Sequence, residues 1–166
     1  MAAGSGSRFG EKKQFKLLGG TALYFYSLNK FLHCKDISEI ILVVPESRVA
    51  DIKKEIANIK KTKKILVVSG GLRRQDSVKN GMLSLSNKSQ LVCIHDGARP
   101  FVSEKLIKQS IIACSNNDGA IVANPNFDTL KTCKKGYVKK TIDRNNVWMA
   151  QTCLLYTSPS PRDFTE

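Results

Sequence analysis

The first residues of the chain have the composition of a phosphate-binding loop. They read Met-Ala-Ala-Gly-Ser-Gly-Ser-Arg-Phe-Gly and are followed at once by Glu-Lys-Lys-Gln-Phe. Small residues such as Ala2, Ala3 and Gly4 let the backbone N–H groups of a loop close around an anion, and Arg8 and Lys13 add positive charge. The stretch predicts a loop that holds phosphate groups, although glycine-rich stretches also form ordinary surface turns.

Three further stretches with polar side chains lie beyond predicted strands. They are Gly-Gly-Leu-Arg-Arg-Gln-Asp-Ser-Val at residues 70–78, His-Asp-Gly-Ala-Arg-Pro at residues 95–100 and Asp-Thr-Leu-Lys at residues 128–131. In a parallel sheet such positions converge on one edge. That edge would combine cationic side chains, one carboxylate and a loop of backbone amides, a set that suits phosphoryl or nucleotidyl transfer.

Length and composition predict one soluble domain. The chain has 166 residues, of which 42% are apolar and 25% charged. No apolar run approaches the roughly eighteen residues of a membrane helix, and the N-terminus has no basic region followed by an apolar one. The five cysteines and two histidines show no zinc spacing, which favours reduced thiols. We therefore expect a cytoplasmic protein with no membrane partner.

A formal net charge of +13 raises the possibility of nucleic-acid binding, because clustered lysine and arginine attract phosphates. Much of the lysine, however, stands at residues 53–54 and 60–64, on the polar face of a predicted helix and just after it. A solvated face explains these lysines, and a basic surface also draws in small anionic substrates. We expect no nucleic-acid partner.

Apolar periodicity predicts alternating helices and strands. The predicted strands cover residues 37–44, 65–68, 91–94 and 120–123. The predicted helices run from a Thr21 cap to about residue 32, from 47 to about 60, from Asp76 or Ser77 to about 85, and from a Ser103 cap to about 114. This alternation predicts an α/β, Rossmann-like fold with a mostly parallel sheet and helices on both faces. Residues 131–140 are polar on both faces and predict a protruding β-arm that packs on a partner subunit.

Five stretches, in order, resemble the 2-C-methyl-D-erythritol 4-phosphate cytidylyltransferase family. They are AAGSGSRFG with KKQF, GGLRRQDSV, IHDGARPFV, DTLK and DRNNVWMAQT, and together they cover about residues 1–152. The resemblance implies a nucleotidyltransferase that condenses CTP with the sugar-alcohol phosphate, releases pyrophosphate and serves the non-mevalonate route to isoprenoids. It also implies Mg²⁺ as cofactor and a homodimer formed through an arm of about residues 127–148.

The resemblance assigns roles to individual residues. It implies nucleotide binding by Ala2, Ala3, Gly4, Gly71 and Ser77, catalysis by Arg8 and Lys13, Mg²⁺ contact by Asp96, and places near the sugar phosphate or catalytic edge for Arg99, Thr129, Arg144 and Thr152. In the family the arm that carries Arg144 reaches the site of the neighbouring subunit. Taken on its residues alone, Asp96 could instead cap a turn, and His95 is more often a structural histidine.

The chain departs from the family's pattern at both ends. The family has an apolar strand before the glycine loop, whereas Met1 here stands directly before Ala2. After Thr152 the residues Cys-Leu-Leu-Tyr-Thr-Ser-Pro-Ser-Pro-Arg-Asp resemble the translation of a transposase adaptor used in sequencing libraries. We expect a partial cytidylyltransferase domain over residues 1–152 and a non-native tail over residues 153–166, so that later site residues of the family are absent.

Four alternatives remain open at this stage. A ribitol 5-phosphate cytidylyltransferase shares most of the motifs, and the chain could be an inactive fragment of either enzyme. A basic nucleic-acid-binding module would not need Asp96. A dinucleotide-dependent oxidoreductase would place an acidic ribose-binding residue at the end of the second strand. At that point this chain has Pro45 and Glu46, which do not clearly match that pattern.

Overall fold

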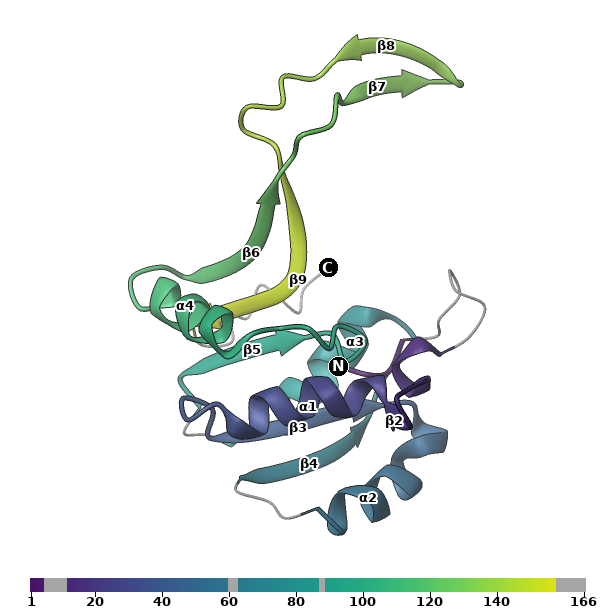
Figure 1. The fold of residues 1–166 in the computed structure, drawn as a ribbon, viewed down its shortest axis with the longest axis vertical. Helices are drawn as coiled ribbons and strands as arrows, with labels where there is room; N and C mark the ends of the chain where they lie inside the picture. The colour runs from purple at the N-terminus through teal and green to yellow at the C-terminus, as the bar shows by residue number, and fades with distance from the viewer. Residues whose placement is uncertain (5–11, 60–62, 87–88, 158–166) are drawn as a thin grey trace.

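The chain forms an α/β body from which a long arm projects (Figure 1). The computed structural model describes residues 1–4, 12–59, 63–86 and 89–157, with side chains up to residue 151. The elements are η1 (Lys13–Phe15), β1 (Leu17–Leu18), β2 (Thr21–Ala22), α1 (Leu23–His33), β3 (Glu39–Val44), η2 (Glu46–Arg48), α2 (Val49–Ala57), β4 (Lys64–Ser69), α3 (Arg74–Met82), β5 (Leu91–His95), α4 (Glu104–Cys114), β6 (Gly119–Pro125), β7 (Lys131–Lys134), β8 (Tyr137–Thr141) and β9 (Trp148–Thr157).

Two groups of strands form the sheet layer of the body. β3 and β4 pair in parallel, with Ile40 opposite Ile65. β9 lies between β5 and β6 and is antiparallel to both, so that β5 and β6 run in the same direction. The α/β class with a Rossmann-like arrangement is confirmed. The insertion of β9 between β5 and β6 was not predicted.

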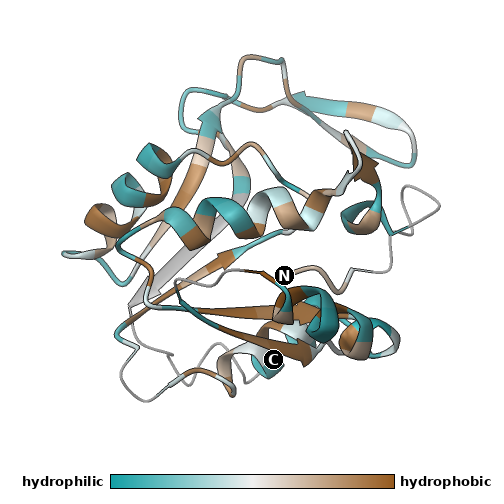
Figure 2. Ribbon diagram, turned by 60° about the horizontal axis from the view of Figure 1, so that its bottom comes forward, coloured by the Kyte–Doolittle hydropathy of each residue, from teal (hydrophilic) through white to brown (hydrophobic). Residues whose placement is uncertain are grey.

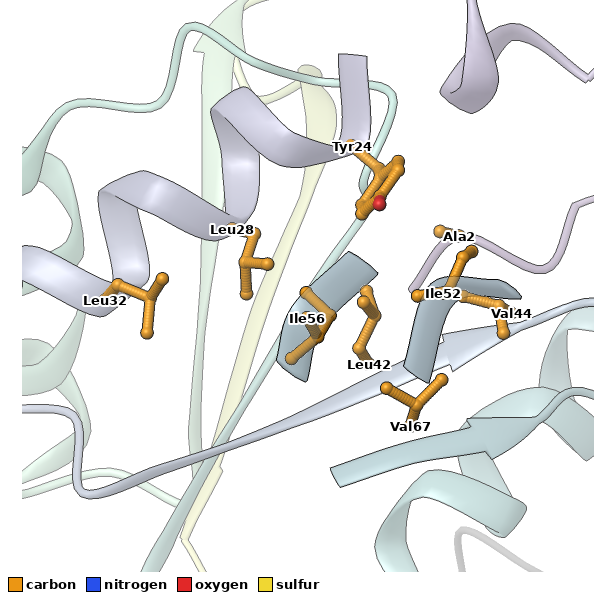
Figure 3. Packing of buried hydrophobic residues seen from close by; sticks show 9 residues of the cluster. All are labelled: Ala2, Tyr24, Leu28, Leu32, Leu42, Val44, Ile52, Ile56 and Val67. Atoms are coloured by element: carbon orange, nitrogen blue, oxygen red, sulfur yellow. The ribbon is translucent and has the colours of Figure 1, made fainter. Parts of the chain in front are cut away.

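Helices cover both faces of β3 and β4 because the side chains of these strands alternate. Leu42 and Val44 point into a cluster with residues of α1 and α2 (Figure 3). Val43 points to the other face, where a Cβ added to Gly81 of α3 would lie 3.0 Å from its Cγ2 atom. In Figure 2 the central strands are mostly hydrophobic, and the helices that cover them mix hydrophobic with hydrophilic residues. This is the pattern expected of strands buried on both faces.

Several predicted boundaries differ from the structure. Thr21 does not cap α1, because it lies in β2 and α1 begins two residues later, after Ala22. α2 ends at Ala57 and α3 begins at Arg74 and ends at Met82, where the sequence predicted ends near 60 and 85. Ser103 does cap α4, since its Oγ accepts the N–H of Leu106 at 3.1 Å.

The arm contains the predicted hairpin. β7 and β8 pair antiparallel and are joined by a turn at Lys135 and Gly136, whose φ angles of 51° and 81° are left-handed. All residues of β8 are exposed. β9 continues to Thr157, so the boundary expected after residue 152 lies inside a strand and stays a prediction.

Candidate functional site

The first two residues of the chain lie between the carboxyl ends of β3 and β5. The Met1 amine donates to the backbone oxygen of His95 at 2.6 Å, and the Gly97 N–H donates back to the Met1 oxygen at 2.6 Å. This pair of bonds is the pattern of a parallel β-ladder. On the other side, the Ala2 N–H donates to Val43 O at 2.7 Å. The glycine loop therefore starts as a short bridge between two strand ends.

The turn after β4 lies against the same loop. The Gly70 N–H donates to Val44 O at 2.7 Å, and the Gly71 N–H donates to the Ser77 hydroxyl at 3.0 Å. A Cβ added to Gly70 would lie 2.4 Å from the Cβ of Ala3 and 2.8 Å from the Ser77 hydroxyl oxygen. The predicted nucleotide-binding residues Ala2, Ala3, Gly71 and Ser77 are thus brought together.

The hydrogen bonds and burial of these residues indicate which of them could contact a nucleotide directly. Ala2 is buried and its N–H is already bonded to Val43, so Ala2 anchors the loop. The buried Ser77 hydroxyl lies within hydrogen-bond distance of the backbone of Gly71 and Arg73, and so shapes the turn. Ala3 and Gly4 are more exposed and are better placed to face a ligand.

Asp96 follows β5 and supplies the carboxylate of this edge. It is half-buried, and its Oδ1 lies 3.5 Å from the Arg74 guanidinium. The Met1 amine is close by, and burial lowers its pKa to about 6.

A magnesium ion at Asp96 would have to draw other ligands from the substrate. Within the described part of the chain, no group of three histidine, cysteine, aspartate or glutamate side chains could hold a metal. Mg²⁺ is commonly held by one or two carboxylates together with substrate phosphates. The single carboxylate of Asp96 beside the predicted phosphate-binding loop fits that mode of binding.

Lys13 lies on η1, and the next residue ties this turn to the glycine loop. Gln14 is buried, and its Nε2 donates to the backbone oxygens of Ala2 at 2.8 Å and Gly4 at 2.9 Å. Phe15 packs edge-on against Tyr24 with ring centroids 5.8 Å apart. The turn that carries Lys13 is therefore held to the glycine loop by Gln14 and to α1 by Phe15.

Five of the predicted site residues lie outside this group. Arg8 falls outside the described residues, and Thr152 is described by its backbone only. Thr129 and Arg144 lie at the base of the arm, where the Arg144 guanidinium donates to Phe127 O at 2.5 Å. Arg99 is exposed near Asp96 and donates to Gln151 Oε1 of β9 at 2.5 Å.

His95 has a structural environment, as its residue type led us to expect. Its ring packs against Phe31 with centroids 5.0 Å apart, and its Nε2 lies 3.0 Å from Arg99 O. A carbonyl oxygen can only accept, so Nε2 carries the proton. His95 thereby fixes the loop that carries Asp96.

Sequence reasoning missed Gln14 and Pro45 as residues that shape the site. In the sequence, Gln14 stands out only as part of the KKQF stretch, and Pro45 only as the residue after the predicted strand at residues 37–44, where an oxidoreductase would have an acidic residue. The signal available in the sequence was only a glutamine between Lys13 and Phe15, because its burial is known from the structure. Its partners are backbone oxygens, which no sequence pattern identifies.

Comparisons with known proteins agree with this arrangement. The family profile described as 2-C-methyl-D-erythritol 4-phosphate cytidylyltransferase matches residues 1–160. The chain belongs to this family. The enzyme of that name from Syntrophus aciditrophicus is 39% identical over 155 residues, which are 91% of this chain and 66% of the relative. The one from Aquifex aeolicus is 41% identical over 152 residues, or 92% of this chain and 66% of the relative.

Solved structures of the family have the same fold. The 4-diphosphocytidyl-2C-methyl-D-erythritol synthase of Anaerococcus prevotii superposes with a TM-score of 0.81 at 35% identity, covering 94% of this chain and 66% of that one. The 2-C-methyl-D-erythritol 4-phosphate cytidylyltransferase of Francisella tularensis gives a TM-score of 0.73 at 28% identity, covering 94% and 69%. This chain thus spans about two thirds of the length of its cytidylyltransferase relatives.

Gly70→Ala is expected to displace the glycine loop. The new Cβ would overlap both Ala3 and the Ser77 hydroxyl, so that one of the two stretches must move. We expect the free energy of unfolding to fall by about 1–3 kcal/mol, the usual cost of overpacking. Gly4→Ala is the matched control, because no atom of the described residues lies within 4 Å of its added Cβ. Urea unfolding of both variants measures the difference, and equal midpoints would contradict the predicted contact.

Proposed function

We propose that this protein transfers CMP from CTP to 2-C-methyl-D-erythritol 4-phosphate and releases pyrophosphate. The observation that carries the proposal is the match to the cytidylyltransferase family over residues 1–160. The meeting of the glycine loop, the 70–77 turn and Asp96 at one edge of the sheet supports it, because an α/β fold binds nucleotides at that edge.

The reaction requires no covalent nucleophile from the protein. A phosphate oxygen of the acceptor attacks the α-phosphorus of CTP in line, the bond to pyrophosphate breaks, and negative charge develops on the equatorial oxygens and the leaving group. In this proposal Lys13 and Arg8 stabilise that charge. The backbone of Ala3 and Gly4 orients the phosphates, and Gly71 with Ser77 shapes the turn against the nucleotide.

In the same proposal Asp96 holds Mg²⁺ together with the phosphates of CTP. The bound ion would neutralise charge on the triphosphate. Arg74 lies 3.5 Å from the Asp96 carboxylate and forms an ion pair with it at this edge. Arg99, Thr129, Arg144 and Thr152 would serve the acceptor phosphate, whose approach to a triphosphate is otherwise repulsive.

The acceptor is tested by a CTP-dependent assay on the protein expressed from its complete gene. We expect pyrophosphate release with 2-C-methyl-D-erythritol 4-phosphate, none with EDTA, and recovery of activity with Mg²⁺. Release with ribitol 5-phosphate alone would assign the protein to the alternative substrate. Salt-sensitive binding to DNA with no pyrophosphate release would instead favour the nucleic-acid-binding alternative.

Lys13→Ala is expected to lower turnover more than it weakens CTP binding. The ammonium acts on charge that is greatest in the transition state, so kcat should fall by ~10²- to 10³-fold while the affinity for CTP changes less. Lys12→Ala is the matched control, since Lys12 is the preceding exposed lysine. Single-turnover kinetics with both variants measure the effect, and an unchanged rate for Lys13→Ala removes Lys13 from the mechanism.

We further propose that the arm joins two subunits. Tyr137 and Val138 of β8 are 77% and 62% exposed, and an isolated two-stranded ribbon is marginally stable in water.

The proposed function places the protein in the cytoplasm, where CTP is available, without nucleic-acid or membrane partners. None of the helices among the described residues is long and apolar enough to cross a membrane.

Replacing Tyr137 and Val138 together with serine is expected to weaken the dimer. Each apolar side chain buried at an interface contributes roughly 1.5–3 kcal/mol, so the dissociation constant should rise by at least about 100-fold. Lys139→Ser, an exposed neighbour on β8, is the control. Sedimentation equilibrium of the protein from the complete gene gives the two constants. A dimer that is unaffected by the double substitution would place the interface elsewhere.

A further inference from the structure

Gln14 connects the glycine loop to the turn that carries Lys13. Its side chain is buried, and its Nε2 donates to two carbonyl oxygens of the loop, those of Ala2 and Gly4. A side-chain amide nitrogen has two hydrogen atoms, so both are used on the same loop. No other orientation of the amide would satisfy two carbonyl acceptors at once.

The need for this donor at Ala2 comes from Pro45. In the parallel ladder with β3, the Ala2 N–H bonds to Val43 O, and the N–H of residue 45 is the group that should bond back to Ala2 O. Residue 45 is proline, which has no N–H. The Gln14 amide therefore supplies the hydrogen bond that the ladder cannot.

The bond at Ala2 also sets the direction of the next amide. The peptide bond is trans, so the N–H of Ala3 points opposite to the oxygen of Ala2. Because Ala2 O is held toward the buried Gln14, the Ala3 N–H is directed away from it. Fixing one carbonyl thus orients one of the donors that the loop can present to an anion.

Gln14 is itself held by neighbouring elements. Phe15 packs on Tyr24 of α1, and the Arg48 guanidinium lies 4.6 Å from the centroid of the Phe15 ring. The Tyr24 hydroxyl donates to Glu55 of α2 at 2.5 Å. The turn of Lys13 and Gln14 is therefore positioned by α1 and α2, and the loop is positioned by the turn.

We propose that Gln14 is a positioning residue for nucleotide binding, which replaces the backbone donor missing at Pro45 and sets the loop and Lys13 at a fixed separation. The inference rests on the proposed function, because it takes the glycine loop as the site of the CTP phosphates. Gln14 acts through the loop and through Lys13, and it need not touch the nucleotide.

The experiment compares Gln14→Leu with Gln14→Leu/Pro45→Ala in the protein from the complete gene. Leucine keeps the volume but leaves the oxygens of Ala2 and Gly4 without this donor. We expect the KM for CTP to rise by about 10- to 100-fold, as for a misplaced binding group, with the KM for the acceptor changed by less than about 3-fold. Alanine at position 45 restores a backbone N–H opposite Ala2 O. In the double variant, at least about a third of the rise in the KM for CTP should therefore be reversed.

The controls separate positioning from folding. Gln109→Leu makes the same exchange at an exposed site on α4 and should leave both KM values unchanged. Pro45→Ala alone should leave the KM for CTP close to that of the unaltered protein, because Gln14 is still present. An equal rise of both KM values, or no recovery in the double variant, would overturn the proposed role.

A second measurement keeps this inference separate from the proposed function. Amide hydrogen exchange of Ala2, whose N–H donates to Val43 O at 2.7 Å, followed by NMR without any nucleotide, should accelerate in Gln14→Leu and slow again in the double variant. If the unaltered protein shows no cytidylyl transfer, the proposed function fails while the exchange experiment still tests the loop. Unchanged exchange at Ala2 would refute the loop-positioning role whatever the activity.

Discussion

The site depends on backbone hydrogen bonds that hold a loop with almost no side chains of its own. Residues such as Ala2, Ala3 and Gly4 cannot fix a conformation by packing, and glycine loses more entropy on ordering than any other residue. The loop is ordered where Met1 and Ala2 bridge the ends of β5 and β3. Each such bond contributes only about 1 kcal/mol net, so several must act together.

The bridge in turn requires the apolar layers on which the strands rest. Leu42 and Val44 of β3 are buried among side chains of α1 and α2 (Figure 3). Val43 packs against Gly81 of α3. A strand with both faces buried cannot shift its register without exposing large apolar side chains. The end of β3 is therefore a fixed point for the loop, the 70–77 turn and, through Gln14, Lys13.

How far the sequence predicted this structure depends on the kind of interaction. Apolar periodicity predicted the strands and helices and the edge where they end, since burial follows the repeat of side chains. The Ser103 cap was predicted from local chemistry, whereas the Thr21 cap was wrong, because Thr21 pairs with Leu18 in a short β-ladder. The position of β9 between β5 and β6 is a long-range pairing, and no local pattern in either strand specifies it.

Site residues divide in the same way. Asp96, Gly71 and Ser77 were predicted as site residues because strand ends and motifs mark them, and the structure places them at one edge of the sheet. Gln14 was missed because its partners are carbonyl oxygens, which every residue carries. The same difficulty applies to Pro45, since the importance of a missing N–H emerges only when the opposite oxygen is known.

The separation of the proposed acceptor residues from the proposed nucleotide residues bears on how a complete site would be assembled. Thr129 and Arg144 lie on the arm, which projects from the body that holds Ala3, Ser77 and Asp96 (Figure 1). An exposed ribbon rich in lysine repels a second copy of itself, so apolar residues such as Tyr137 and Val138 must supply any attraction between arms. If the arm seats on a partner, Arg144 arrives from a different chain than Asp96. Acceptor binding would then depend on assembly, whereas the nucleotide half would be built within one chain.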